Sequence, residues 1–337
     1  MGELRSFSRR DRGEGASLGG VSLPLGVSAN DQEPASTERA RKILWVLVGL
    51  FALESAVGVI YQGVAVITAV HLLLMVAFAM LHASLRYGWK GALAFAAICL
   101  VVSNIFENIG VATGFPFGPY HYTDALGPKL GYVPLMIGPA YLGVGYMAWV
   151  MGTILIGDVR RGASALSTFA TPFIAAFVMV LWDLSLDPGA ATEGKWWIWH
   201  DGGGFFGVPL QNYLGWYLTV FVFMQLFALY LRARGPAQGT VQPKSYFAQA
   251  VAMYALVALN FVFSYLVEVS QPVTDAAGAT WHTGDIAETA AITSLLTMMF
   301  VVALAAMKVA RERPRNCHAR PTEPQTAAGH RAASPAE

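Results

Sequence analysis

The chain has 337 residues, of which 55% are hydrophobic and only 13% are charged. Charged residues usually make up about 25% of a soluble domain, and the mean hydropathy is +0.49, so the composition excludes an ordinary soluble enzyme and indicates an integral membrane protein. The net charge of +1 argues neither for nor against an anionic partner, and we expect no nucleic acid to bind. The two cysteines, Cys99 and Cys317, provide neither a disulfide framework nor a metal-binding spacing.

Polar segments flank a long apolar region. Residues 1–42 and 308–337 predict disordered tails, because they bury too little apolar surface to fold. Residues 43–307 predict an all-α, polytopic transmembrane helix bundle that forms the catalytic domain. Its eight apolar runs, each of about 20 residues, lie near 43–60, 64–82, 91–111, 133–157, 165–186, 207–231, 247–267 and 285–307. Seven spans result instead if the first two runs, joined at residues 61–63, form a re-entrant pair.

The number of lysine and arginine residues alternates between high and low from one connection to the next. It is high before the first run, around 86–90, at 160–161, at 232–244 and in the C-terminal tail, and it is low in the other connections. Because positively charged loops stay on the cytoplasmic side, we expect both termini in the cytoplasm and the loops at 112–132 and 187–206 on the outer face. The protein is then a multi-pass protein of the inner membrane.

This orientation places the membrane-embedded carboxyl groups in the outer half of the bilayer. Ionisable side chains inside a membrane are costly and mark functional sites. The alternative is that residues near helix ends are simply solvated. We expect a polar pocket at or under the outer face, formed by Glu54, Glu107, Asp183, Asp187, Glu268, Asp285 and Glu288 together with Asn212 and His71.

The first polar block runs from Asn104 to Pro134. Glu107 lies between Asn104 and Asn108 at the end of an apolar run, and a loop rich in glycine, proline and aromatic residues follows. Glycine and proline favour tight turns there. We expect this loop to lie at the membrane interface or to fold back over the bundle, and to bring aromatic side chains to the substrate, namely Phe117, Tyr120 and Tyr122.

The second polar block runs from Asp183 to Trp216. Asp183 and Asp187 are four residues apart and share one helix face, and Pro188 is expected to end that helix. Aromatic residues follow, and an interfacial belt of tryptophan is an ordinary alternative explanation for them. The candidate substrate-binding residues of this block are Trp196, Trp199, Asn212 and Trp216.

These blocks carry a family resemblance. FENIGVATGFPFGPYHY with LGPKLGYVP, and DLSLDP with WxW and FGVPLQNYLGW, resemble the membrane carotenoid 1,2-hydratases of acyclic ψ-end groups, including the bacterioruberin-type hydratases. The resemblance covers residues 104–216, and the remaining spans agree in hydropathy only. It implies addition of water across the terminal C1=C2 bond of a substrate such as lycopene or γ-carotene, taken from the bilayer, by a hydro-lyase. Neighbouring enzymes of the carotenoid pathway are the implied partners.

The chemistry of hydration assigns roles to these residues. An acid must protonate C2, a tertiary cation forms at C1, and water captures it, so neither a cofactor nor a metal is required. Burial helps to keep a carboxylic acid protonated. Glu107 is the first candidate for the acid and Asp183 the second. Asp187 and aromatic faces are candidates to stabilise the cation, and the asparagines to hold the water. Glu54 and His71 complete the expected pocket.

Other functions use the same residues. A lycopene-cyclase-like enzyme would share the protonation step, with an internal alkene as the nucleophile. A prenyltransferase would use Asp183 and Asp187 to hold Mg²⁺ and diphosphate, although few basic residues lie nearby. A carotenoid-binding protein or transporter would use the acids as a proton relay. Scattered histidines disfavour a di-iron enzyme, and the absence of lysine from the span interiors disfavours a retinal protein.

Overall fold

The computed structural model describes residues 35–60, 65–236 and 242–311. The expected tails up to residue 34 and from residue 312, and the connection at 61–64, lie outside the described residues. If α7, the π-helical turn η2 and α8 are taken as one continuous helix, the described residues form seven helices. These are α1 (Ala35–Ile60), α2 (Ala65–Thr113), α3 (Ile137–Leu155), α4 (Ala165–Pro188), α5 (Leu210–Arg234), α6 (Lys244–Val267) and the run α7 (Thr283–Thr293), η2 (Ser294–Met298) and α8 (Met299–Arg311).

The helix α1 begins earlier than the expected boundary at residue 43. It starts at Ala35, and its first turns carry an ion pair of 2.8 Å between Lys42 Nζ and Glu38 Oε1. The two charges stand four residues apart on one helix face, where such pairs favour the helix. Hydropathy alone does not find this polar extension, so residues 35–42 belong to the helix and not to a disordered tail.

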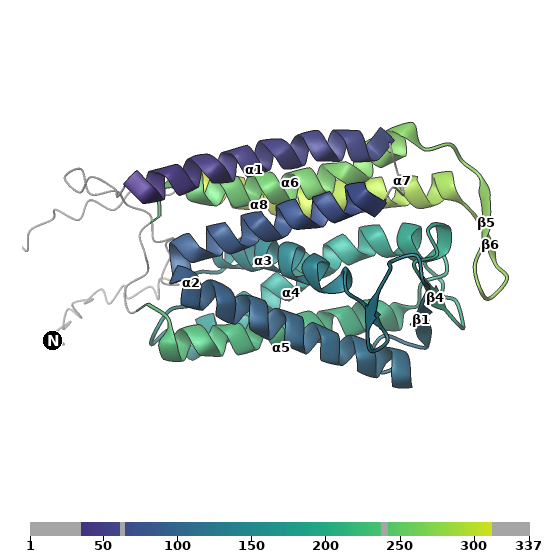
Figure 1. Cartoon of the computed structure of the whole chain (residues 1–337), viewed down its shortest axis with the longest axis horizontal. Coiled ribbons are helices and arrows are strands. Elements are labelled where there is room, and N and C mark those ends of the chain that lie inside the picture. The colour runs from purple at the N-terminus through teal and green to yellow at the C-terminus, as the bar shows by residue number, and fades with distance from the viewer. Residues whose placement is uncertain (1–34, 61–64, 237–241, 312–337) are drawn as a thin grey trace, which may run out of the picture.

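The helix α2 contains two of the expected apolar runs. Its 49 residues would extend over roughly 74 Å at about 1.5 Å per residue, more than twice a hydrocarbon core of about 30 Å. The helix is interrupted by a kink at Gly88, whose φ of 68° and ψ of 169° are not helical. Glycine adopts such a positive φ without a steric penalty. Figure 1 shows the second arm of α2 turning back along the bundle.

Six helices of the described part are long and apolar enough to cross a membrane by length and composition. They confirm a multi-pass helical protein, and the finer count of eight spans stays a prediction. The two numbers differ for two reasons. The kinked α2 counts as one helix among the six, and α3, which corresponds to the fourth expected run, is not one of them.

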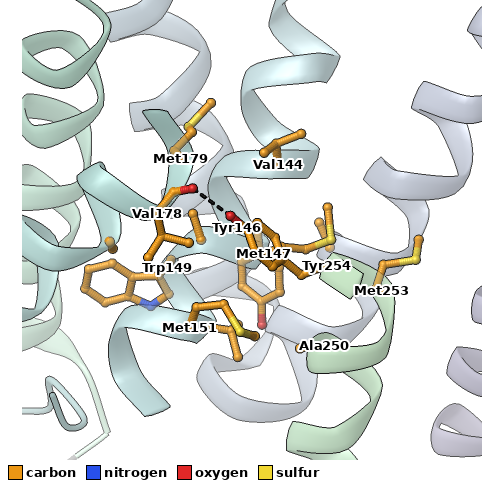
Figure 2. Close-up of a cluster of buried hydrophobic side chains, with 14 of the residues drawn as sticks. Val144, Tyr146, Met147, Trp149, Met151, Val178, Met179, Ala250, Met253 and Tyr254 are labelled. Carbon is orange, nitrogen blue, oxygen red and sulfur yellow. Dashed lines mark hydrogen bonds between the residues drawn. The ribbon is translucent and has the colours of Figure 1, made fainter. Parts of the chain in front are cut away.

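The helix α3 forms the centre of the bundle. Its residues from Tyr141 to Ile154 are all buried. Figure 2 shows side chains of α3, α4 and α6 packed together, with the Tyr254 hydroxyl donating a hydrogen bond of 2.8 Å to the Val178 carbonyl. The peripheral helices instead expose large apolar side chains suited to lipid, such as Leu53, Leu73, Leu266 and Phe300. The interior helix α3 is therefore packed against protein along most of its length, whereas the peripheral helices present apolar side chains suited to the bilayer.

Three small antiparallel sheets gather at one end of the bundle, which we call the loop end (Figure 1). They pair β1 (Tyr120–Tyr122) with β4 (Trp197–Trp199), β2 (Lys129–Leu130) with β3 (Val133–Pro134), and β5 (Pro272–Thr274) with β6 (Thr280–His282). The opposite end holds the first turns of α1 and the last turns of α8. There Gln249 bonds to the Arg41 carbonyl at 2.8 Å, and Lys244 bonds to the Ala310 carbonyl at 2.6 Å.

Candidate functional site

A cavity of about 620 Å³ lies at the loop end. Both arms of α2 contribute to its wall, together with α1, α3, α4, α5, α6, α7 and the strands β1 and β4. Helices far apart in sequence thus meet around one space that is lined by both aromatic and polar side chains. The predicted site residues in this wall are Glu54, His71, Glu107, Phe117, Tyr120, Tyr122, Trp196, Trp199, Asn212 and Trp216.

The two polar blocks of the sequence are joined by the β1–β4 sheet. Its register places Tyr120 opposite Trp199 and Tyr122 opposite Trp197. Side chains alternate across a strand, so Tyr120, Tyr122 and the two tryptophans share the buried face, and each is at least 92% buried. The sheet therefore presents one continuous aromatic surface to the cavity.

Phe117 anchors the first loop between two helices. A Cβ atom at Gly110 of α2 would lie 2.6 Å from the Phe117 ring, and one at Gly215 of α5 would lie 2.7 Å from it. Any larger residue at either position would displace the ring, so both glycines are needed for this close approach. The anchored ring fixes the start of β1, which follows directly.

Glu107 lies at the centre of this surface, only 2% exposed. Its Oε2 accepts hydrogen bonds from the Tyr120 hydroxyl at 2.5 Å and the Tyr122 hydroxyl at 2.9 Å, and its Oε1 accepts one from the Tyr141 hydroxyl at 2.7 Å. Three donors from β1 and α3 thus hold one carboxyl from α2. Hydrogen bonds to an ionised acceptor are stronger than neutral ones, so this arrangement stabilises the carboxylate that remains after proton transfer.

The two tyrosines of β1 remain protonated donors. Burial, followed by the neighbouring Glu107 carboxyl, raises the pKa of Tyr120 and of Tyr122 well above the ordinary tyrosine value. Desolvation and a nearby negative charge both disfavour the phenolate. Each hydroxyl therefore keeps its hydrogen for Glu107.

Asp183 and Asp187 form a second acidic group, one layer behind the cavity wall. The Asn212 amide bonds to Asp183 Oδ2 at 3.1 Å and also to Asp187 Oδ2, and the Trp197 indole donates to Asp187 Oδ1 at 2.6 Å. Both aspartates are buried, but neither lines the cavity. Asp183 Oδ1 is a buried atom without a hydrogen-bond partner among the described residues.

The two acidic groups are linked through the β1–β4 sheet. Tyr122, which bonds to Glu107, pairs with Trp197, which bonds to Asp187. Within the described ranges, no lysine or arginine forms an ion pair with any of these three carboxyls. Buried carboxylates without a cation are costly, so the cluster favours states in which a proton is shared among its members.

Asn104 and Asn108 lie elsewhere. Asn108 bonds to the Asn104 carbonyl at 2.8 Å, and its Oδ1 accepts from the Tyr132 backbone N–H at 2.9 Å. Neither asparagine lines the cavity. They fasten the β2–β3 loop to α2, and the structure does not bring them to Glu107's partners.

The remaining predicted acids divide into two groups. Glu54 Oε2 and His71 Nδ1 lie 2.7 Å apart in the cavity wall, and Glu268, also in the wall, accepts a hydrogen bond of 2.6 Å from Thr283. Asp285 and Glu288 are exposed and do not line the cavity. Only some of the carboxyl groups that were expected to form the polar pocket therefore line the cavity.

Sequence reasoning missed two residues that donate hydrogen bonds to the acidic side chains of the site. Tyr141 lies inside the apolar run of α3, and Trp197 was passed over in favour of its neighbours. Each had a signal. A buried tyrosine needs a partner for its hydroxyl, and period-two alternation places Trp197 on the same strand face as Trp199. Tyr141 also stacks on Trp216, with ring centroids 4.3 Å apart and planes 1° from parallel. The helical segment does not end at Pro188 as expected, because α4 passes into one π-helical turn, η1 (Gly189–Glu193), which continues it.

Comparison with known proteins gives two matches. A family model described as "Carotenoid biosynthesis protein" matches residues 67–284. A bisanhydrobacterioruberin hydratase from Haloarcula japonica is 38% identical over 143 residues, which are 41% of this chain and 45% of that protein. The match thus spans less than half of that relative. No solved structure matches the chain.

Proposed function

The chain belongs to the carotenoid biosynthesis protein family, and on this premise we propose that it is a carotenoid hydratase. It adds water across the terminal C1=C2 bond of an acyclic ψ-end group such as that of lycopene or γ-carotene. The relative named as a hydratase supports this choice within the family. The observation that carries it is the buried Glu107 carboxyl, which faces the cavity and receives three tyrosine hydroxyls.

In this mechanism Glu107 in its acid form gives its proton to C2 of the alkene. The π electrons form the new C2–H bond, and a tertiary cation remains at C1. Three hydroxyl donors stabilise the Glu107 carboxylate as it forms, which lowers the barrier for this uphill step. Water then attacks C1 and loses a proton, which gives a tertiary alcohol.

The aromatic wall stabilises the cation. Tyr141 and Trp216 are stacked, and Trp182 meets Trp216 edge to face with ring centroids 6.0 Å apart. The faces of such rings attract a cation within about 6 Å. Asp183 and Asp187 lie behind this wall, and the carboxylate form of either would also favour the cation without contact with it.

We place the loop end at the outer face of the inner membrane. The charge pattern of the connections supports this orientation, and both ends of the described chain lie at the opposite end of the bundle. Water then reaches the site from the outer side, and the apolar bundle receives the polyene from the bilayer.

Product mass tests the proposal. Cells that make lycopene and express the chain should accumulate a more polar carotenoid that is heavier by one water, and its oxygen should come from labelled water. An isomer of unchanged mass would instead support a cyclase. Unchanged pigment in cells with confirmed membrane protein would reject hydration of this substrate and favour binding or transport. Lengthened prenyl products would support the prenyltransferase.

A further inference from the structure

Glu54 and His71 form a carboxylate–imidazole pair on a different part of the cavity wall. Glu54 comes from α1 and His71 from the first arm of α2, whereas Glu107 comes from the second arm. The Glu54 Oε2 to His71 Nδ1 distance is 2.7 Å, and the side chains are 10% and 21% exposed, respectively. Both face the same space as Glu107.

The pair fixes the orientation of the imidazole. With a Glu54 carboxylate as the acceptor, Nδ1 carries the hydrogen, and in this neutral tautomer the lone pair lies on Nε2. No hydrogen bond to Nε2 comes from the residues that the structure describes. The Phe51 ring packs on the imidazole, with ring centroids 4.5 Å apart. His71 therefore has one nitrogen held by its partner and one left for a ligand in the cavity.

We propose that His71 is the general base of the hydration, and that Glu54 is its positioning residue. This inference rests on the proposed function. After Glu107 protonates C2, the oxygen of a water molecule forms the C1–O bond, and His71 Nε2 removes a proton from that oxygen. The protonated imidazole then returns its proton through solvent to the Glu107 carboxylate. One alkene and one water thus give one alcohol, and both side chains regain their first states.

The separation of acid and base makes chemical sense. A tertiary cation readily loses a neighbouring proton to a base and reverts to an alkene. The aromatic wall that favours the cation comes from β1, β4, α3, α4 and α5, whereas His71 enters from the side of α1 and the first arm of α2. The base and the aromatic wall thus come from different parts of the cavity lining.

Three other carboxyls near the site suit this role less well. Asp183 and Asp187 do not line the cavity, and Asp187 is bound by Trp197 and Asn212. Glu268 is engaged with Thr283. General base catalysis by a placed imidazole accounts for roughly 10²- to 10⁴-fold in rate.

Deuterium exchange separates the two steps. Isolated membranes that contain the protein and lycopene are incubated in D₂O, and both the alcohol and the recovered lycopene are analysed by mass. His71→Gln should form alcohol at least about 100-fold more slowly. Its recovered lycopene should still gain deuterium at the chain end, because Glu107 protonates the alkene and the cation reverts. The exposed His282, outside the cavity wall, gives the matched control His282→Gln, which should behave as wild type.

Glu54 variants test the positioning role. Glu54→Gln keeps a hydrogen-bonding group beside His71 but removes the charge. It should lower kcat by about 10-fold or more without a matching change in KM, and Glu54→Asp should restore part of the loss. A purely structural role would leave the Gln variant active.

The outcomes are distinct. Wild-type alcohol formation by His71→Gln would overturn the role of the pair and leave the hydratase intact. Loss of both alcohol and deuterium uptake, with normal amounts of membrane protein, would also overturn it, because the first step does not need a base. A wild-type protein that forms no water adduct would reject the proposed function itself, and the base with it.

Discussion

Two buried polar clusters lie at opposite ends of this bundle, and they balance their charges in different ways. At the end remote from the loops, Arg86 Nη2 lies 2.9 Å from Asp158 Oδ1, and Arg86 Nη1 bonds to Thr153 at 3.1 Å. Beside it, His82 stacks on Tyr246 with ring centroids 3.7 Å apart. At the loop end, Glu107 has hydroxyl donors and, among the described residues, no cationic partner.

The difference separates a structural cluster from a reactive one. A buried charge that meets its counter-ion is neutral as a pair, and the pair joins α2 to the segment after α3. A buried carboxyl that meets only neutral donors can exchange a proton with something in the cavity. This contrast makes different predictions for mutations at the two ends.

The largest expected effect is at Glu107. Glu107→Gln keeps the size and the hydrogen-bonding capacity of the side chain but removes the acid. Because acid catalysis is worth about 10²- to 10⁴-fold, hydration should fall at least about 100-fold, while the amount of protein in the membrane stays near wild type. The measurement is alcohol formed per unit of membrane protein.

Glu288 provides the matched control for this variant. It is an exposed glutamate of α7 that does not line the cavity, so Glu288→Gln should retain full activity. Wild-type activity of Glu107→Gln would contradict the role of Glu107 as the acid, and with it the assignment of the loop-end cluster as the reactive one.

The next effect should be on stability and not on chemistry. Asp158→Asn breaks the buried ion pair between Arg86 and Asp158, and breaking such a pair costs about 3–5 kcal/mol. We expect less protein in the membrane and a lower melting temperature in detergent, with unchanged activity per folded molecule. Replacement of both partners, Arg86→Met with Asp158→Leu, should recover much of the loss. A specific loss of kcat in Asp158→Asn would contradict the structural role.

The smallest expected effect compares two tyrosines of the same helix. Tyr141→Phe removes one of three donors to Glu107, and a hydrogen bond to a charged group is worth about 1.5–3 kcal/mol. Hydration should fall by about 10- to 150-fold, since each 1.4 kcal/mol is a factor of about ten in rate. Tyr146, one turn and a half further along α3, bonds instead to His82 at 2.8 Å. Tyr146→Phe should reduce thermal stability and leave kcat unchanged. Equal losses of kcat in both variants would contradict a specific role for the Tyr141 hydroxyl at Glu107.

Motifs located the site better than hydropathy located the helices. The blocks around Glu107 and Asp183 pointed to the family, which is confirmed, and their loops meet in the β1–β4 sheet. The predicted boundary of the first helix at residue 43 was wrong, because α1 begins at Ala35 and hydropathy does not detect its polar first turns. The predicted runs at 64–82 and 91–111 correspond to the two arms of α2, which meet at the non-helical Gly88. The expectations for the tails and the membrane orientation stay predictions.

The sequence by itself determined the class of the protein, the apolar segments and the presence of acids within them. These properties follow from local composition, because polar groups in apolar runs are costly wherever the chain places them. Only the tertiary structure decided which acid faces the cavity and which lies behind it. Glu107, Asp183 and Asn108 look equally embedded along the chain, but distant segments surround each differently: tyrosines of β1 and α3 surround Glu107, Asn212 of α5 bonds Asp183, and a loop backbone occupies Asn108.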